Sequence, residues 1–412
     1  MDIQEAQEIL HVPQPIETLA QFYRLMQATR EVRFRIVTHY LAERKAGTDD
    51  INLLQNAYNA LKSIQESLDG RLLAIDDTRK IAVDLSYEET ELDKDLHFLT
   101  KGEDAFYNHL HALHPSLEMQ LAETLPKLSP VTFRNLISDR DGTVNNYCGR
   151  YLSSIQSVYN AVFLTRFARK CVANAILLTS APLENGGMVD ICTMPDGAFI
   201  LAGSKGREYR DKQWNRDTYP IEPEQQNILN TLTEQITELL QKDEFEKFSY
   251  IGSGFQQKFG QLTIARQDIS QSIPAQESLD FLQILNNLVF DLDREKKFFR
   301  IEDTGLDVEI ILTVGDTGRG ESLRDFNKGD GVAFLDKKLH LEMKKGPNLI
   351  CGDTFSDIAM LKTARKLTQN TRGIFVTRDL VLQEQVEEVF PKTIFLDEPD
   401  TLVVLLNELA KR

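Results

Sequence analysis

Two pairs of aspartates are the residues of this chain best placed to carry out chemistry together. Asp139 and Asp141 follow an apolar stretch that ends at Ile137, and Asp353 and Asp357 follow a second, shorter apolar run. Alternate residues at a strand end project to the same side, so Asp139 and Asp141 can share one metal ion and one reacting group. The first pair alone would also fit an ordinary acidic turn. Four carboxylates at two strand ends indicate a bound cation.

Strand and helix patterns alternate from residue 130 to the C-terminus, and both aspartate pairs follow strands of this region. Such alternation predicts an α/β fold with a doubly wound parallel sheet and helices on both faces. Ligands of these sheets bind at the carboxyl ends of the strands, where both pairs fall. The expected strands are 131–137, 175–178, 348–351, 373–377 and 393–396, and the expected helices are 154–171, 328–341, 356–367 and one from residue 400.

Residues 179–328 interrupt this alternation with a helix-strand-strand unit that occurs twice. The first unit combines a helix at 222–241 with strands at 245–252 and 260–265. The second combines a helix at 275–293 with strands at 297–301 and 307–314. Two such units can form one small sheet covered by two helices, so we expect an inserted α+β cap that lies over the active site as a lid.

The first 125 residues read as a helical bundle without a catalytic constellation. Apolar residues recur at helical spacing from Pro15 to Leu41 and again from Leu54 to Leu68, and residues 86–114 are further helical material. This spacing predicts a three-helix antiparallel module that forms a homo-oligomer or docks a helical partner, with a passive structural appendage as the alternative. The expected domains are therefore the bundle at 1–125, a core of 126–204 and 315–412, and the cap at 205–314.

The composition excludes several classes of partner. The 412 residues include 63 acidic and 47 basic side chains, which give a formal charge of −16. Nucleic acid is not expected as a partner, because its binding depends on a basic surface. The four cysteines show no metal-binding spacing and are expected to be reduced. The sequence shows neither a secretion signal nor an apolar run of about 18 residues, so we expect a cytoplasmic protein that does not enter a membrane.

The motifs of the chain, taken together and in order, resemble those of the haloacid dehalogenase superfamily. Within it, the position of the cap and three further motifs resemble the trehalose-6-phosphate phosphatases, and the helical N-terminal module is similar to that of their nematode form. Many relatives have Ser-Gly-Arg at the second motif and a His where Lys205 stands, whereas this chain has Thr179-Ser180-Ala181-Pro182 at the second motif. The four core motifs are Asp139-x-Asp141-Gly142-Thr143, Thr179-Ser180, Asn327-Lys328-Gly329 and Gly352-Asp353-x-x-x-Asp357, and the further motifs are 201–206, 301–306 and 327–329.

This resemblance implies a Mg²⁺-dependent phosphatase that hydrolyses trehalose 6-phosphate, and the residue types fit that chemistry. Asp139 would be the nucleophile that forms an aspartyl-phosphate, and Asp141 would be the general acid and base. Lys328 would offset the charge of the phosphoryl group, and the hydroxyl of Thr179 or of Ser180 would bind a phosphate oxygen. The expected metal site consists of Asp139, the backbone carbonyl of Asp141, Asp353 and, orienting them, Asp357.

The choice of sugar depends on the cap, for which the sequence offers four charged candidates. Lys205, Arg207, Glu302 and Asp303 could contact the substrate, although each also fits an ordinary exposed charge. A phosphatase or mutase for another sugar phosphate is the first alternative, because the core motifs do not select the sugar. A non-enzymatic scaffold that acts through the N-terminal helices is the second.

Overall fold

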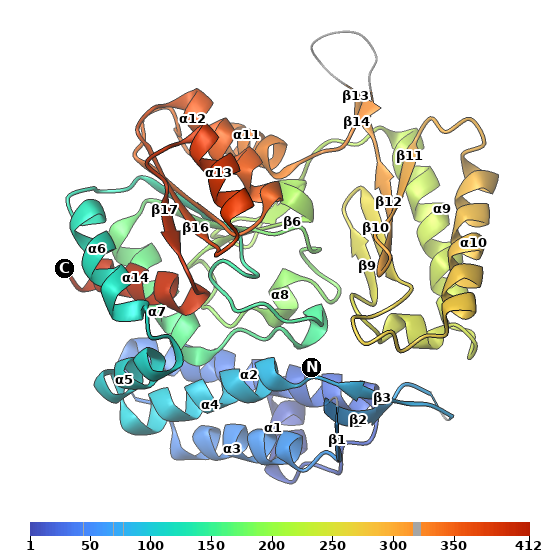
Figure 1. Ribbon diagram of the computed structural model, residues 1–412, viewed down its shortest axis with the longest axis horizontal. Helices are drawn as coiled ribbons and strands as arrows, with labels where there is room; N and C mark the ends of the chain where they lie inside the picture. Colours follow the sequence, from blue (N-terminus) through green and yellow to red (C-terminus); the bar gives the residue numbers. More distant parts are fainter. Residues whose placement is uncertain (44, 69, 77, 316–322) are drawn as a thin grey trace.

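An eight-stranded sheet forms the centre of the molecule (Figure 1). The computed structural model describes residues 1–43, 45–68, 70–76, 78–315 and 323–412. The strands lie in the order β17-β16-β15-β4-β5-β6-β7-β8. Their bounds are β4 Asn135–Ser138, β5 Asn174–Leu178, β6 Ile200–Gly203, β7 Glu208–Arg210, β8 Arg216–Thr218, β15 Asn348–Gly352, β16 Thr371–Val376 and β17 Ile394–Leu396.

Successive side chains of the central strands enter two different cores, one on each face of the sheet. In β4, Leu136 belongs to one core and Ile137 to the other, and β15 alternates in the same way through Leu349 and Ile350. This is the period of two that a sheet buried on both faces requires. Helices α7 (Val158–Cys171) and α14 (Pro399–Lys411) contribute to the first core, and α11 (Lys328–Leu339), α12 (Ile358–Leu367) and α13 (Leu380–Val389) to the second.

The α/β class expected from the sequence is confirmed, but the sheet is not wholly parallel. Strands β17 to β6 pair in parallel, whereas β7 pairs antiparallel with β6 and β8 antiparallel with β7. A short connection is sufficient for antiparallel neighbours, and residues 211–215 provide one between β7 and β8. Residues 208–218 therefore extend the central sheet, whereas the sequence analysis assigned them to the cap at 205–314.

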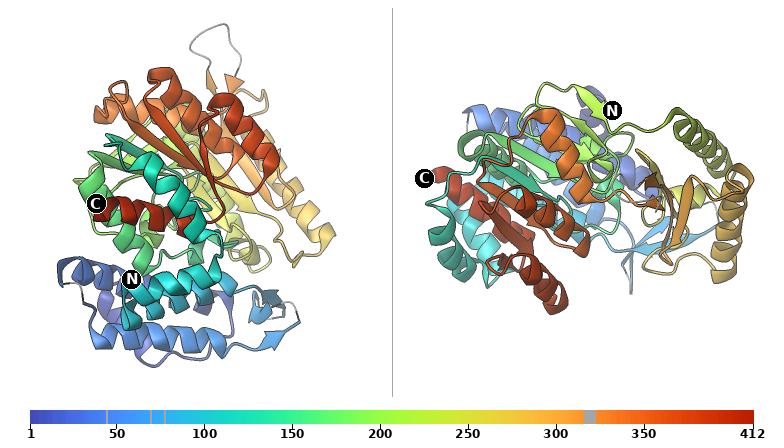
Figure 2. Two further views of the ribbon diagram at one scale, coloured as in Figure 1. Left: turned by 60° about the vertical axis from the view of Figure 1, so that its left-hand side comes forward. Right: turned by 90° about the horizontal axis from the view of Figure 1, so that it is seen from above.

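The cap is a four-stranded antiparallel sheet with two helices, α9 (Pro223–Leu240) and α10 (Ala275–Leu292). It stands to one side of the central sheet in Figure 1 and in the right-hand view of Figure 2. The predicted strand at 245–252 is wrong: residues Glu246–Ser249 form a 3-10 turn, in which Phe248 stacks on Phe281 of α10. The strands, in sheet order, are β11 (Phe299–Asp303), β12 (Asp307–Leu312), β10 (Gln261–Ala265) and β9 (Phe255–Lys258).

The N-terminal module contains more elements than the three helices expected. Helix α3 ends at Lys62, and the chain continues into a small antiparallel sheet, so the helix predicted to reach Leu68 is wrong there and Leu68 is exposed. The helices are α1 (Ile3–His11), α2 (Leu19–Glu43), α3 (Thr48–Lys62), α4 (Ser86–Lys101), α5 (Glu103–Leu113) and α6 (Leu117–Leu128), and the strands are β1 (Glu66–Ser67), β2 (Gly70–Ala74) and β3 (Lys80–Val83).

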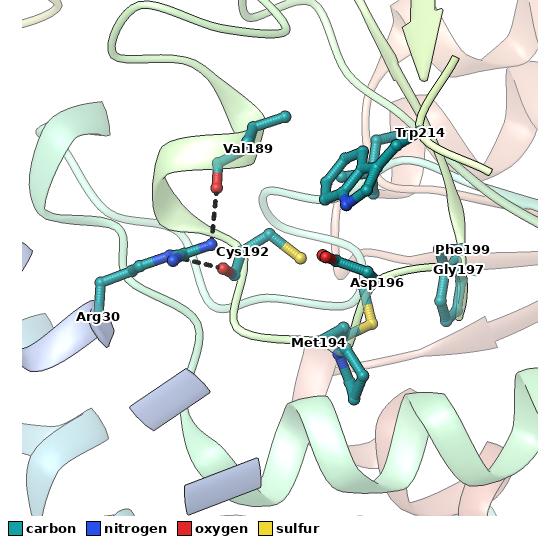
Figure 3. Close-up of a pocket in the computed structure, with 10 residues that line it drawn as sticks. Arg30, Val189, Cys192, Met194, Asp196, Gly197, Phe199 and Trp214 are labelled. Carbon is teal, nitrogen blue, oxygen red and sulfur yellow. Dashed lines mark hydrogen bonds between the residues drawn. The ribbon is translucent and has the colours of Figure 1, made fainter. Parts of the chain in front are cut away.

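The module is bonded to both other parts of the molecule. Arg30 of α2 donates to the carbonyl oxygens of Val189 and Cys192 in the core, at 3.2 and 3.0 Å (Figure 3). The hydroxyl of Tyr23 donates to the carbonyl oxygen of Tyr250 in the cap, at 2.9 Å. The module therefore packs against the core and the cap at the same time, below both of them in Figure 1.

The remaining elements are short. They are the helical segments η1 (Tyr151–Ser153), α8 (Met188–Ile191), η2 (Ser204–Gly206), η3 (Glu246–Ser249) and η4 (Phe355–Asp357), and the paired strands β13 (Val314–Gly315) and β14 (Leu323–Arg324). Residues 316–322 of the second predicted core segment lie outside the described residues. In the part of the chain that the structure describes, no helix is both long and apolar enough to cross a membrane. The cytoplasmic location expected from the sequence stays a prediction.

Candidate active site

The two aspartate pairs meet because their strands are neighbours in the sheet. Strand β15 pairs in parallel with β4, with Cys351 opposite Ser138, and the backbone N–H of Asp139 continues the ladder by donating to the carbonyl oxygen of Cys351 at 3.0 Å. Asp139 therefore leaves the end of β4 beside Asp353, which leaves the end of β15. This is the carboxyl edge of the sheet, where α/β folds bind ligands.

Lys328 joins this edge from the first turn of α11. Its ammonium Nζ lies 2.8 Å from Oδ1 of Asp139 and 2.6 Å from Oδ1 of Asp357, and all three side chains are buried. The side chain of Asn327 caps the helix by accepting from the N–H groups of Gly329 and residue 330, which fixes where α11 begins. The structure thus brings together the lysine and the two aspartates named from the sequence.

Asp357 and Asp353 are held by bonds that leave little freedom to either side chain. Oδ2 of Asp357 accepts from the backbone N–H groups of Asp353 and Thr354, at 3.0 and 2.9 Å. The hydroxyl of Thr143 donates to Oδ1 of Asp353 at 2.6 Å. Gly142 has a φ of +82°, and a Cβ at this position would lie 2.1 Å from Oδ2 of Asp353, so glycine is required here.

The electrostatics of the cluster fit a divalent cation. Burial raises the pKa of Asp139 and of Asp353, and the carboxylates around each raise it further, while Lys328 opposes the rise. Burial would lower the pKa of Lys328, but Asp139 and Asp357 raise it overall, so the lysine stays charged. One oxygen each of Asp139, Asp353 and Asp357 lies within 4.8 Å of the others. Such a group of carboxylate oxygens suits a hard cation.

Asp141 lies beside this cluster, but its side chain has other partners. The carboxylate is bonded by the buried guanidinium of Arg140 and accepts from the hydroxyl of Ser154 at 3.1 Å. The carboxylate oxygens that could hold a metal together are those of the other three aspartates. The carboxylate of Asp141 is thus engaged by two neighbours, and its roles as general acid and base and as a backbone ligand of the metal stay predictions.

Thr179 and Ser180 follow β5, which pairs with β4 on the side away from β15. They therefore lie at the same sheet edge as Asp139. The hydroxyl of Thr179 accepts from the backbone N–H of Ala181 at 3.2 Å, and its carbonyl oxygen accepts from the N–H of Lys205 at 2.8 Å. Thr179 is buried and Ser180 is half-buried. Phosphate binding by the hydroxyl of Thr179 or of Ser180 stays a prediction.

Arg207 connects the core to the cap. Its guanidinium donates to the carbonyl oxygens of Gly260 and Leu312, at 2.9 and 3.1 Å, and lies 4.8 Å from the ring centroid of Phe326. Two of the five N–H donors of Arg207 thus hold the cap, and a contact of this side chain with the sugar stays a prediction.

Lys205 lies in η2, between β6 and β7 of the central sheet, next to helix α11. It is half-buried with a φ of +61°, and its carbonyl oxygen lies so close to Gly331 of α11 that a Cβ there would be 2.1 Å away. Burial lowers the pKa of Lys205, and Glu309 of the cap opposes this effect.

Glu302 and Asp303 lie on the exposed outer strand of the cap, and both are paired with arginines of the same region. Arg300 donates to Glu302 at 2.9 Å, and Arg266 donates to Asp303 at 2.8 Å. Within the described residues, neither carboxylate has a hydrogen bond to the core. Their roles in substrate binding stay predictions.

Two charged cap residues that were not expected from the sequence interact electrostatically with Lys205. Lys258 of β9 is buried, and its Nζ lies 3.9 Å from Oε1 of Glu309 on β12. Burial lowers the pKa of Lys258 to about 8, the charge of Lys205 adds to this effect, and Glu309 opposes it. Lys258 was missed because the strand that carries it was predicted about ten residues too early.

A cavity of about 330 Å³ lies where the module, the core and the cap meet. Tyr87 lines it from α4 of the module, Tyr147 and Arg150 from the loop that follows Asp141, and Asp307 from the cap. The N-terminal module therefore forms part of the wall of this cavity.

Comparison with known proteins decides the family. The model of the trehalose-6-phosphate phosphatase C-terminal domain matches residues 136–402, and that of the trehalose-6-phosphate phosphatase N-terminal helical bundle domain matches residues 18–117. The chain belongs to the trehalose-6-phosphate phosphatase family. The resemblance seen in the sequence motifs is thereby confirmed. The match to residues 136–402 includes the segments that carry all four core motifs.

Individual relatives are similar at moderate identity. A Caenorhabditis elegans protein named alpha,alpha-trehalose-phosphate synthase [UDP-forming] 2 is 31% identical, over 92% of this chain and 32% of its own length. A trehalose-phosphatase of Brugia malayi is 28% identical, over 96% of this chain and 86% of its own. The solved C-terminal domain of C. albicans trehalose-6-phosphate phosphatase aligns with a TM-score of 0.46 and 14% identity, over 71% of this chain and 96% of that one. The chain spans about a third of the first relatives it matches.

Proposed function

We propose that this chain is a Mg²⁺-dependent phosphatase that hydrolyses trehalose 6-phosphate to trehalose and phosphate through an aspartyl-phosphate. The observation that carries the proposal is the buried contact of Lys328 with Asp139, next to Asp353 and Asp357, at the carboxyl edge of the sheet. A phosphate monoester is very stable in water, so catalysis depends on offsetting its charge and on placing a nucleophile in line with the leaving group.

Asp139 is the nucleophile of this proposal. Lys328 binds its Oδ1, and we assign the attack on phosphorus to Oδ2. As the new O–P bond forms, the bond between phosphorus and the sugar oxygen breaks, and its electron pair goes to that oxygen. Asp141 donates a proton to the departing oxygen. A water molecule then attacks phosphorus, gives a proton to Asp141, and releases phosphate as the Asp139–phosphorus bond breaks.

The metal would be held by the side chains of Asp139 and Asp353 with the backbone carbonyl of Asp141. Asp357 bonds Lys328 through one oxygen and two backbone N–H groups through the other, which suits a residue that orients the site. When bound, Mg²⁺ would offset the negative charge that carboxylates and phosphate bring together.

The sugar would lie between the core and the cap. The charged side chains of Lys205, Lys258 and Glu309 influence one another electrostatically, and we assign them to the binding of the hydroxyl groups of a disaccharide. Trehalose 6-phosphate as the substrate is supported by membership of the family. A role of residues 1–125 in homo-oligomer formation or in docking a helical partner stays a prediction.

A panel of phosphorylated sugars tests this proposal. We expect phosphate release from trehalose 6-phosphate in the presence of Mg²⁺, loss of release with EDTA, and recovery when Mg²⁺ is added back. Asp139→Asn is the matched control, because the amide keeps the shape of the side chain but is a poor nucleophile. Faster hydrolysis of another sugar phosphate would mean that this sugar phosphate, and not trehalose 6-phosphate, is the substrate. Equal release by Asp139→Asn would refute the catalytic assignment.

A further inference from the structure

Helix α4 of the N-terminal module packs on the loop that follows Asp141, and a buried glutamate forms the centre of this contact. Glu88 has no exposed surface. Its Oε1 accepts from the hydroxyl of Ser153 at 2.5 Å and from the guanidinium of Arg150 at 3.3 Å. Both partners belong to the loop of residues 142–157 between the catalytic strand β4 and helix α7. A residue of the module thus holds this loop from outside the core.

Tyr87, the neighbour of Glu88, bonds the same loop on both sides of Ser153. Its hydroxyl donates to the carbonyl oxygen of Ile155 at 3.2 Å and accepts from the side-chain amide of Asn145 at 3.0 Å. Apart from the short turn η1, this part of the loop has no regular secondary structure. Its conformation therefore depends on side-chain bonds of this kind.

Ser154 of this loop bonds Asp141, so the position of the loop affects the Asp141 side chain. The hydroxyl of Ser154 accepts from the guanidinium of Arg140 at 3.1 Å and from the amide of Asn145 at 3.2 Å. Because two N–H groups point at its oxygen, the single hydroxyl proton is directed to Oδ1 of Asp141, 3.1 Å away. The orientation of the Asp141 carboxylate thus depends on Arg140, which bonds it directly, and on where the loop places Ser154.

We infer that Tyr87 and Glu88 of the N-terminal module are positioning residues for the general acid Asp141. This inference rests on the proposed function, because it requires Asp141 to protonate the leaving group. It assigns to the module a part in the chemistry of each active site, in addition to any role in association. A displacement of even about 1 Å can cost a reaction a large factor in rate, so a loosened loop is sufficient to slow proton transfer.

Leaving groups separate positioning from simple destabilisation. Phenolate is a poor leaving group that needs a proton, whereas 4-nitrophenolate leaves without one. We would measure kcat/KM of the full chain for phenyl phosphate and for 4-nitrophenyl phosphate, with Mg²⁺ present. We expect Tyr87→Phe and Glu88→Gln to lower kcat/KM for phenyl phosphate about tenfold more than for 4-nitrophenyl phosphate, a part of the ~10²–10⁴-fold that general acid catalysis supplies.

Glu89→Gln is the matched control on the same helix. Glu89 pairs with Lys62 at 2.6 Å and with Arg71 at 3.2 Å, all within the module, so its loss should affect both substrates equally. Equal losses on both substrates for Tyr87→Phe, with unchanged circular dichroism, would overturn the inference. Asp141→Asn separates the two proposals. If Asp141→Asn lowers kcat/KM equally for both substrates, the proposed role of Asp141 fails. If Asp141→Asn discriminates between the two leaving groups but Tyr87→Phe and Glu88→Gln do not, only the inference fails.

Discussion

The ammonium of Lys328 lies 2.8 Å from the carboxylate of Asp139, buried at the carboxyl edge of the sheet, although the two residues are far apart in the chain. Removing one partner leaves charges buried without compensation, so we expect Lys328→Met to abolish turnover and to destabilise the fold by about 3–5 kcal/mol. Thermal unfolding and phosphate release measure the two effects. Lys338→Met, at the exposed end of the same helix, removes only a surface pair with Asp217 and should change neither by much.

Gly142 tests how closely the backbone after Asp141 approaches the carboxylate of Asp353. We expect Gly142→Ala to lose most Mg²⁺-dependent activity, because the new Cβ would displace the carboxylate of Asp353. Gly305→Ala is the control: its φ is +87°, but a Cβ there meets nothing within 4 Å, so only a backbone cost of about 1–2 kcal/mol is expected. Titration of activity with Mg²⁺ compares the two. Unchanged Mg²⁺ dependence in Gly142→Ala would contradict the described packing.

Asp400 of helix α14 bonds both the N-terminal module and the loop of residues 142–157. It should make the stability of the protein depend on pH. Its carboxylate accepts from Lys94 at 2.6 Å and from Asn146 at 2.8 Å, and His114 lies 2.6 Å away. Burial would raise the pKa of Asp400, but Lys94 and then His114 hold that pKa well below its ordinary value. The stabilisation is therefore present above the unfolded-state pKa of about 3.9 and is lost as the pH falls from there toward the lower folded-state value.

We expect Asp400→Asn to destabilise the protein by about 3–5 kcal/mol at pH 7, because Lys94 then remains buried with less compensation. The difference from the wild type should shrink as the pH falls below about 4. Thermal unfolding at a series of pH values measures it. A difference that stays constant down to pH 3 would mean that the charge of Asp400 does not carry the stabilisation.

Lys205, between β6 and β7 of the central sheet, and Lys258 of the cap should select the sugar. We expect Lys205→Met and Lys258→Met each to lower kcat/KM for trehalose 6-phosphate by about ten- to a hundredfold, since a hydrogen bond to a charged group contributes roughly 1.5–3 kcal/mol. Hydrolysis of 4-nitrophenyl phosphate, which has no sugar, should change little. Lys242→Met, an exposed change in the cap, serves as the control. Equal losses on both substrates would refute selection by the two lysines.

The sequence was sufficient to locate the catalytic edge because the relevant signals are local. The apolar runs before Asp139 and Asp353 predict buried strands, and adjacent parallel strands necessarily end at one edge. Lys258 could not be found in this way, because an irregular 3-10 turn with Phe248 at its centre replaced the strand expected there. Glu88 and Glu89 carry the same side chain at neighbouring positions. Only the fold decides that Glu88 contacts the loop of residues 142–157 and that Glu89 pairs within the module.

The central claim is covalent catalysis by Asp139, and trapping the intermediate tests it most directly. Asp141→Asn should still accept a phosphoryl group from 4-nitrophenyl phosphate, whose leaving group needs no proton, but should release it slowly without a general base. We would mix this variant with Mg²⁺ and phosphorus-labelled 4-nitrophenyl phosphate, quench in acid, and map the labelled peptides. The account predicts a burst of 4-nitrophenolate matched by label on the peptide that contains Asp139. Release of 4-nitrophenolate with no label on that peptide would contradict it.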